Sequence, residues 1–405
     1  MSQPLVLRNR AFARVWAAQI CSQVAGRMFQ AGIVWWVVSE VAASVRGRAT
    51  GPFMMLASLP AVLLIPVVAR ALARYTSRSV MRTAELAAAA VTLVLLGWAL
   101  LTDLPMAAPY PAVFLLAVTQ CFFNPCLTKS VPELVDAGDI QHATSFEMST
   151  QSIAGLVGAV AGPYLIHLGG PAPLVAACSG AFLLAALLIH VAGFRTGTAP
   201  RPSAPGGPAP APRKLRAVLA DLPFVRTVLI CFAAANLFAT AGAVIYPLYV
   251  RGVFGDDPGV LVLFQVAIGI GMLVGSFSGP HVPGRPTTLG PLCLLGIAAG
   301  LTVPGLVVNR MLTSVALLGV GWCAGVLGVK FVTLFQHTVP AADKPVFFAA
   351  MQALMTATFP VASIAFGFLG DLLEPRTLCL VQGIGLLPAA LALLTTRDRE
   401  PVPVS

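Results

Sequence analysis

The sequence predicts an all-α polytopic membrane protein whose 12 transmembrane helices form two six-helix bundles. Hydrophobic residues make up 58% of the 405-residue chain and charged residues only 10%, whereas a soluble domain carries roughly 25% charged residues. The charges also divide the sequence into apolar windows of about 20 residues, the length of one membrane helix. Finally, a segment rich in proline, alanine and glycine separates these windows into two sets of six.

The first set of windows forms the predicted N-terminal bundle. Lipid offers no hydrogen-bond partner to the backbone, so each window is expected to be helical. Because the first window is long enough to span and lacks a small-residue cleavage site, we expect a membrane helix there and not a signal peptide. The windows occupy residues 12–40, 49–69, 83–102, 109–129, 143–168 and 172–194.

The second set begins after a linker. Residues 195–222 have too few apolar side chains to bury a core and are expected to be a flexible or polyproline-like connection. Phe12-x-Arg14 and Phe224-x-Arg226 open the two halves alike, as expected for a parallel repeat. The second windows occupy residues 223–250, 258–280, 286–308, 312–336, 345–370 and 376–396. The predicted domains are therefore 1–194, the cytoplasmic linker 195–222, 223–396 and a cytoplasmic tail at 397–405.

The distribution of arginine and lysine predicts the orientation. If the N-terminus is cytoplasmic, 18 of these residues lie in inner segments and 5 in outer ones, and positive residues accumulate on the cytoplasmic side. We therefore expect both termini in the cytoplasm. The same distribution accounts for the net charge of +10 without a nucleic-acid partner. The preponderance of arginine over lysine, with abundant alanine and proline, suggests a high-GC bacterium, so we expect this membrane protein in the bacterial inner membrane.

Catalytic chemistry is not indicated. The sequence contains no G-x-x-x-x-G-K-[ST] phosphate loop, and no nucleophile, base and orienting group occur together. The eight cysteines lie inside apolar windows without zinc-site spacing, and the five histidines are scattered. We therefore expect no enzyme activity, no cofactor and no metal site, in a monomer that contacts the lipid bilayer.

Two cations interrupt the apolar windows. Arg27 lies about fifteen residues into the first window, close to mid-bilayer at roughly 1.5 Å rise per residue. A charge there costs roughly 2.5–3.5 kcal/mol on insertion scales, so it is expected to face a wet cavity or a partner. It either binds anionic or carbonyl oxygens of a substrate or forms a structural ion pair. Lys330, in the tenth window, either joins such a site or extends its ammonium toward the inner interface.

Carboxylates and neutral polar side chains complete the candidate site. Glu147 is the candidate for proton coupling, or it is an interfacial residue in contact with water. Glu85 is expected to pair with the basic loop between the second and third windows, which contains Arg74 and Arg78, as part of a cytoplasmic gate. Candidate substrate contacts, each of which is alternatively a hydrogen bond between helices, are Gln19, Gln23, Gln30, Gln120, Asn124, Gln151, Asn236, Tyr246, Gln265 and Gln336.

Four ordered blocks of sequence resemble the major facilitator superfamily, and within it the branch of the enterobactin exporter and the macrolide efflux pumps. The first is the F-x-x-x-W-x-x-Q-x-x-S pattern that begins at Phe12. The others are LASLPAVLLIPVVARALARYTSRSVMRTAEL, FFNPCLTKSVPELVDAGDIQHATSFEMSTQSIAGLVGAVAGP and LFQHTVPAADKPVFFAAMQALMTATFPVASIAFGFLGDLL. The chain departs from the family pattern at Ala69 and Ala73, where the loop signature has Gly and Asp, and at Leu116 and Arg27. Gly158-x-x-x-Gly162-Pro163 is retained from the antiporter motif.

The resemblance implies a secondary transporter in which the first and tenth helices flank a central cavity, where Arg27 and Lys330 would hold one substrate. The expected activity is export of a small amphipathic metabolite, siderophore-like, or of a drug, with a proton gradient as the driving force. Two alternatives stay open. One is import of a siderophore or organic anion by the same fold, and the other is translocation of lysophospholipid between leaflets.

Overall fold

The computed structural model describes residues 8–136, 139–194, 220, 222–255, 257–340 and 343–395. Within these ranges the chain is nearly all helical and contains no β-strand. Each predicted apolar window coincides with one long helix or with two consecutive ones. The linker at 195–222 lies outside the described residues except for Ala220 and Leu222, and the predicted C-terminal tail lies wholly outside them.

Nine helices in the described ranges are long and apolar enough to cross a membrane. A tenth span is formed if α3 (Arg46–Leu63) and α4 (Ile65–Arg74), which meet at a bend of 52°, are counted as one. Helices α2 (Arg10–Glu40) and α7 (Ile140–Gly169) match the first and fifth windows in position but are not among these nine, and Ile153–Gly169 of α7 is apolar but shorter than the others. The chain is therefore an integral multi-pass membrane protein, and the number of 12 spans stays a prediction.

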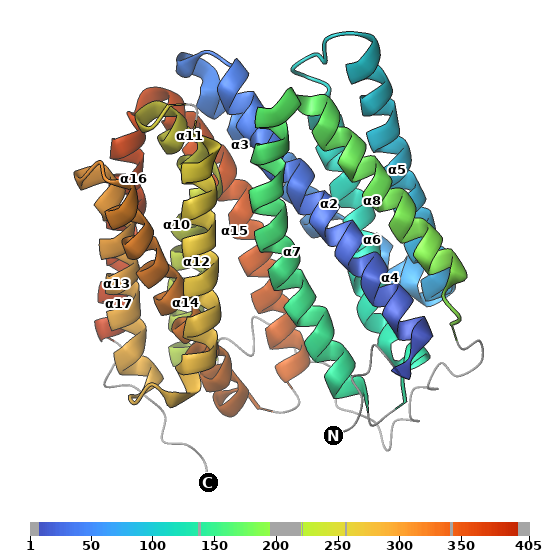
Figure 1. The fold of residues 1–405 in the computed structure, drawn as a ribbon. Helices are drawn as coiled ribbons and strands as arrows, with labels where there is room; N and C mark the ends of the chain where they lie inside the picture. Colours follow the sequence, from blue (N-terminus) through green and yellow to red (C-terminus); the bar gives the residue numbers. More distant parts are fainter. Residues whose placement is uncertain are drawn as a thin grey trace. The chain divides into compact units, whose positions relative to one another are not determined.

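The chain forms two compact units: Met1–Glu40 with Leu56–Gly207, and Val41–Met55 with Pro208–Ser405. In unit 1, α2 packs against α6, α7 and α8, and α5 packs against α6 and α8 (Figure 1). Its apolar core includes Phe12, Met81, Phe123 and Ile189. Its helices are α2 (Arg10–Glu40), α4 (Ile65–Arg74), α5 (Ser77–Leu101), α6 (Pro109–Leu134), α7 (Ile140–Gly169) and α8 (Pro171–Val191).

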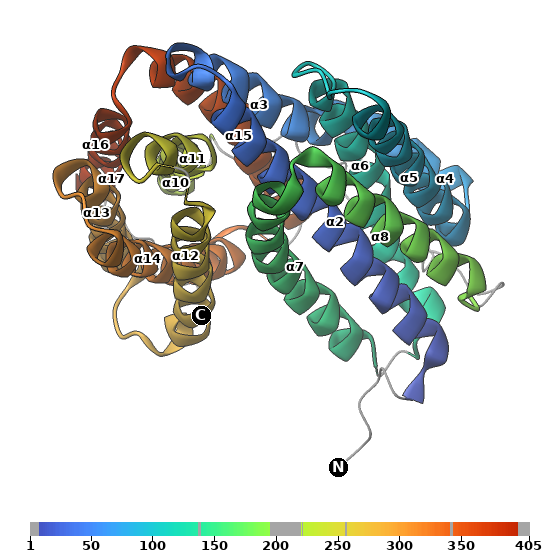
Figure 2. The ribbon, with the colours of Figure 1, turned by 45° about the horizontal axis from the view of Figure 1, so that its top comes forward.

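In unit 2, α12 packs along α14, and α13 packs against α14, α16 and α17 (Figure 2). Its core is aromatic, with Phe335 and Phe347 edge to face at 5.1 Å between ring centroids. Its helices are α10 (Pro223–Thr240), α11 (Gly242–Val253), α12 (Pro258–Ser278), η3 (Gly279–His281), α13 (Pro286–Leu306), α14 (Arg310–Thr338), α15 (Lys344–Leu372), α16 (Pro375–Ile384) and α17 (Leu387–Thr395).

Reciprocal glycines bring α12 and α14 into close contact. A Cβ atom on Gly271 would lie 2.1 Å from the carbonyl oxygen of Leu318, and one on Gly321 would lie 2.2 Å from that of Ile268. Gly275 and Gly325 repeat the arrangement one turn further along each helix. Such small-xxx-small pairs let membrane helices associate by direct backbone packing. We call these four glycines the α12–α14 seam.

Helix α3 (Arg46–Leu63), preceded by η1 (Ala43–Val45), is shared between the units because its residues up to Met55 group with unit 2. Its first turn packs on the end of α15. A Cβ on Gly47 would lie 2.0 Å from the carbonyl oxygen of Gly367, and one on Gly51 would lie 2.6 Å from that of Ser363. This grouping differs from the predicted domains at residues 41–55.

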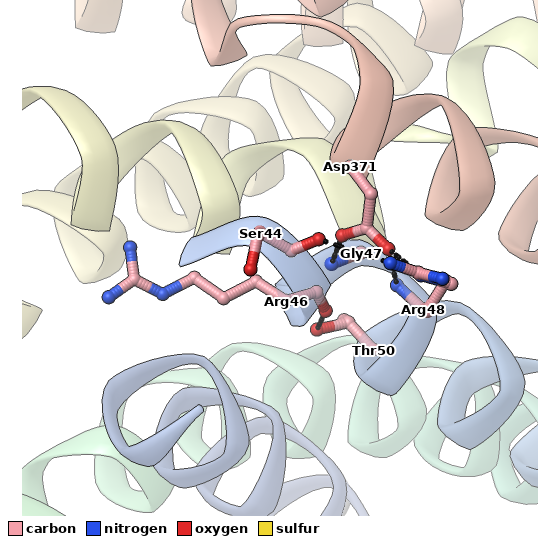
Figure 3. Close-up of polar contacts among 6 residues, drawn as sticks. All are labelled: Ser44, Arg46, Gly47, Arg48, Thr50 and Asp371. Carbon is pink, nitrogen blue, oxygen red and sulfur yellow. Dashed lines mark hydrogen bonds and ion pairs between the residues drawn. The ribbon is translucent and has the colours of Figure 1, made fainter. Parts of the chain in front are cut away.

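A carboxylate from α15 caps α3 at this contact (Figure 3). Asp371 accepts hydrogen bonds from the Gly47 N–H at 2.7 Å, the Arg48 N–H at 3.1 Å and Arg48 Nε at 2.6 Å. The first N–H groups of a helix have no intrahelical partner, and Asp371 supplies one from a distant part of the chain. Its side chain is only 4% exposed, against 56% for Arg48.

Candidate functional site

The position of Arg27 is set by close packing of α2 on α7. A Cβ on Gly158 would lie 2.5 Å from the Cβ of Arg27, and one on Gly162 would lie 2.3 Å from the carbonyl oxygen of Met28. The retained Gly158-x-x-x-Gly162 pattern therefore has a direct physical role, because a larger residue would separate the two helices. The backbone at Arg27 is held against α7 near the middle of α2.

Arg27 is an exposed residue. Among the described residues, no hydrogen bond or ion pair of its side chain is found, although Arg carries five N–H donors. A cation in the middle of an apolar helix is stable only in contact with water or with an acceptor. Arg27 is thus a donor-rich group available to a ligand.

A buried chain of amides lies on the same helix. Gln19 Nε2 donates to Gln23 Oε1 at 3.2 Å, and Gln23 Nε2 donates to Asn124 Oδ1 at 3.3 Å. Gln19 and Gln23 are buried, whereas Asn124, on α6, is exposed. Gln30 is half-buried on α2, and Gln151 is exposed on α7. The structure therefore joins Gln23 and Asn124 in one network that ends at an accessible amide.

Glu85 occupies a different place from the one expected. It lies on α5 with 0% exposure, and its Oε1 accepts a hydrogen bond from Ser22 Oγ at 2.7 Å. Ser22 Oγ in turn accepts from Gln120 Nε2 at 3.0 Å. Glu85 therefore does not pair with the basic loop as expected, because its carboxyl group faces the buried side of α2, where Ser22 binds it.

Arg78 of the loop binds the end of α8 instead, together with Arg14 of α2. Arg78 donates to the His190 carbonyl oxygen, and Arg14 donates to that of Val191 at 2.7 Å. The last carbonyls of a helix lack intrahelical partners and carry partial negative charge, which cations stabilise. Arg74 is exposed at the end of α4.

The α4–α5 turn is held by side chains of α6. Lys129 Nζ donates to the Leu72 carbonyl oxygen at 2.7 Å, and Ser77 Oγ donates to Glu133 Oε1 at 2.9 Å. These contacts fix the turn in a chain that has alanine at position 73, where the family pattern has aspartate.

In unit 2, Lys330 has a structural partner. Its Nζ donates to the Val282 carbonyl oxygen at 2.9 Å, at the end of η3. Tyr246 is 4% exposed with its ring against Gly242, which places it in the packed core and not on an accessible surface. Gln265 is half-buried on α12. The two cations singled out in the sequence therefore differ: Lys330 is bonded within its own unit, and Arg27 is available.

Two further predictions have a limited test. The side chain of Glu147 lies outside the described residues, so its coupling role stays a prediction. Groups of three or more histidine, cysteine or acidic residues that could hold a metal are absent from the described part of the chain. Sequence reasoning missed Asp371 and the glycines that face it, although Gly47-x-x-x-Gly51 and a lone acid at the end of a window were visible signals.

Comparisons with known proteins identify the fold. The family model described as Major Facilitator Superfamily matches residues 15–355. A crystal structure of the peptide transporter POT in complex with sulfate superposes with a TM-score of 0.72 at 12% identity, covering 96% of this chain and 95% of that one. No curated protein sequence matches significantly.

Two other solved structures are similar over nearly all of both chains. A bacterial homologue of the human lysosomal transporter Spinster, in an inward-facing unoccupied conformation, gives a TM-score of 0.68 at 10% identity, covering 100% of each chain. The nucleoside transporter NupG gives 0.65 at 11% identity, covering 94% of this chain and 99% of that one. These likenesses establish the fold. With the family match over most of its length, the chain belongs to the major facilitator superfamily, whose members are membrane transporters and not enzymes.

Proposed function

We propose that this protein is a secondary transporter that works by alternating access and exports a small amphipathic metabolite, siderophore-like, or a drug, across the bacterial inner membrane in exchange for protons. The observation that carries the proposal is Arg27, an exposed arginine near the middle of α2 without a protein partner among the described residues.

The chemistry of Arg27 favours a substrate with acidic or chelating oxygens. A guanidinium presents donors in a planar fork that matches a carboxylate or a pair of neighbouring oxygens. The exposed Asn124 at the end of the amide network adds a neutral polar group in the same unit. Lys330 takes no part in this proposal because its ammonium is already bonded to Val282.

The substrate and the direction of transport are tested together. Metabolites that accumulate inside a deletion strain, and that complementation removes, are the candidate exported compounds. Everted membrane vesicles should then take up the identified compound when a proton gradient is imposed. Uptake by right-side-out vesicles instead would identify an importer, and movement of lysophospholipid between leaflets would identify a lipid translocator. Either result overturns export of a metabolite.

Replacement of Arg27 tests the binding site. Arg27→Gln should lower vesicle uptake roughly ten- to hundredfold, since a hydrogen bond to a charged group contributes about 1.5–3 kcal/mol and about 1.4 kcal/mol is tenfold. Arg27→Lys should retain part of the activity because the charge is kept. Arg226→Gln is the matched control, since Arg226 is an exposed arginine at the start of α10. Unchanged uptake by Arg27→Gln would exclude this site.

A further inference from the structure

Glu85 is a buried acid whose second oxygen has no protein partner. The residue has 0% exposure, and only Oε1 is engaged, by Ser22 Oγ at 2.7 Å. No partner of Oε2 is found among the described residues. A carboxylate in this position would keep a buried negative charge on an atom without a donor, which costs far more than burying the neutral acid.

The partners of Glu85 are themselves neutral and satisfied. Ser22 has one hydroxyl proton, which it gives to Glu85, and it accepts from Gln120 Nε2 at 3.0 Å. Ser22 therefore has no second proton to offer to the carboxyl group. A proton on Oε2 of Glu85 would remove the buried negative charge, although the new O–H would find no acceptor among the described residues.

Among the described residues, no charged side chain of the neighbouring helices makes a hydrogen bond or an ion pair with the carboxyl group of Glu85. On α5 itself, Arg82 is one turn earlier, and its guanidinium contacts His190 Nδ1 at 3.3 Å. On α2, the Cys21 thiol is the nearby titratable group. The cations of α4 are exposed, and Lys129 and Glu133 of α6 bind the α4–α5 turn. The buried faces of α6 and α8 contribute Cys126 and Cys178 as titratable groups.

We propose that Glu85, with Ser22, is a proton-binding site of unit 1, loaded in this conformation and emptied when α2 moves relative to α5. This inference rests on the proposed proton-coupled transport and assigns its carrier. On release, Oε2 passes its proton to water and the acid becomes a carboxylate. That step requires the site to open, because Glu85 has no solvent exposure while the Ser22–Glu85 bond is made.

The site adjoins the proposed substrate site through α2. Ser22 and Arg27 are five residues apart on this helix, which is about 7.5 Å along its axis. A substrate that binds Arg27 and shifts α2 would therefore move the hydroxyl that holds the carboxyl of Glu85. Through this movement of α2, substrate binding at Arg27 would hinder or favour proton release from Glu85, and proton release would likewise hinder or favour substrate binding.

Infrared spectroscopy tests the protonation state without a substrate. The full-length protein in liposomes at neutral pH should show a neutral carboxyl stretching band that disappears in Glu85→Gln. In Ser22→Ala the band should persist at a shifted frequency, because the hydrogen bond to Oε1 is lost while the acid stays buried. An identical carboxyl band in wild type and Glu85→Gln would overturn the proposal. If Glu85→Gln does not fold, Ser22→Ala provides the test, because an unshifted band in that variant would also overturn the proposal.

Transport distinguishes a coupling role from a structural one. With 2,3-dihydroxybenzoate as the probe, wild-type proteoliposomes should accumulate it when a pH gradient is imposed and exchange it without one. Glu85→Gln should lose gradient-driven accumulation at least tenfold and keep exchange. Equal gradient-driven accumulation by both proteins would overturn the assignment of Glu85. A wild-type protein that does not move the probe would contradict the proposed substrate class, and the infrared band would then decide the proton site by itself.

Discussion

Arg27, Lys330 and Asp371 all place a charge on a long helix, and the neighbouring atoms give each a different role. Lys330 stabilises a helix end through the Val282 carbonyl oxygen. Asp371 is nearly buried and accepts two backbone N–H groups together with Arg48 Nε. Only Arg27, among these three, keeps its donors accessible. At the scale of the residue, function follows from which hydrogen bonds the fold has already used.

The capping role of Asp371 predicts an unequal effect of two substitutions. Asp371→Ala leaves two N–H groups of α3 without an acceptor and should destabilise the protein by about 2–4 kcal/mol, from the loss of a cap and the cost of unsatisfied donors. Arg48→Ala removes only a half-exposed ion pair, for which about 0.5 kcal/mol is typical. Unfolding of the purified proteins by denaturing detergent measures both. Equal losses would show that the ion pair, and not the backbone cap, stabilises this contact.

The helix positions were predictable from sequence because lipid solvation imposes long apolar windows, and each window coincides with observed helix. The partners of individual polar side chains were not. Whether Glu85 faces the basic loop or Ser22 depends on how α5 is rotated against α2, which hydropathy does not record. Tyr246 was expected at an accessible surface, yet helix packing covers it. Apolar windows therefore predict where the helices lie along the chain. The partners of polar side chains depend on how several helices pack together, which hydropathy does not give.

The α12–α14 seam predicts opposite effects for glycines on one helix. Gly321→Ala would place a methyl group 2.2 Å from the Ile268 carbonyl oxygen and should cost about 1–3 kcal/mol through overpacking. A Cβ on Gly319, on the same helix, would have no neighbouring atom within 4 Å, so Gly319→Ala should stabilise by about 1 kcal/mol through helix propensity. Thermal unfolding in detergent measures the two signs. A Gly321→Ala protein at least as stable as wild type would contradict the seam.

At the scale of the whole molecule, the two compact units do not follow the order of the chain. Residues 41–55 belong to unit 2 although they precede most of unit 1. Helix α3, which contains residues 46–55 of this segment, continues to Leu63 and so enters both units. A change in the arrangement of the units during transport would therefore act on α3, either within the helix or at its bend with α4.

Cutting the chain tests this shared helix. Fragments 1–207 and 208–405, expressed together with a tag on one, should purify as a pair because the first fragment carries a segment of unit 2. Gly51→Leu should reduce recovery of the untagged fragment severalfold, since a Cβ there would lie 2.6 Å from the Ser363 carbonyl oxygen. Gly97→Leu is the control, because its Cβ would have no neighbour within 4 Å. Equal recovery with both variants would contradict the role of α3.

The cap that Asp371 of α15 provides for α3 also has a consequence for biosynthesis. Gly47 is separated by 324 positions from the aspartate that accepts its N–H, so a ribosome adds all of these residues after Gly47 before the acceptor exists. During translation, the N–H groups of Gly47 and Arg48 lack this acceptor until Asp371 has been made. The contact between α3 and α15 is thus expected to form only after α15 has been synthesised and inserted, when Asp371 can reach Gly47 and Arg48.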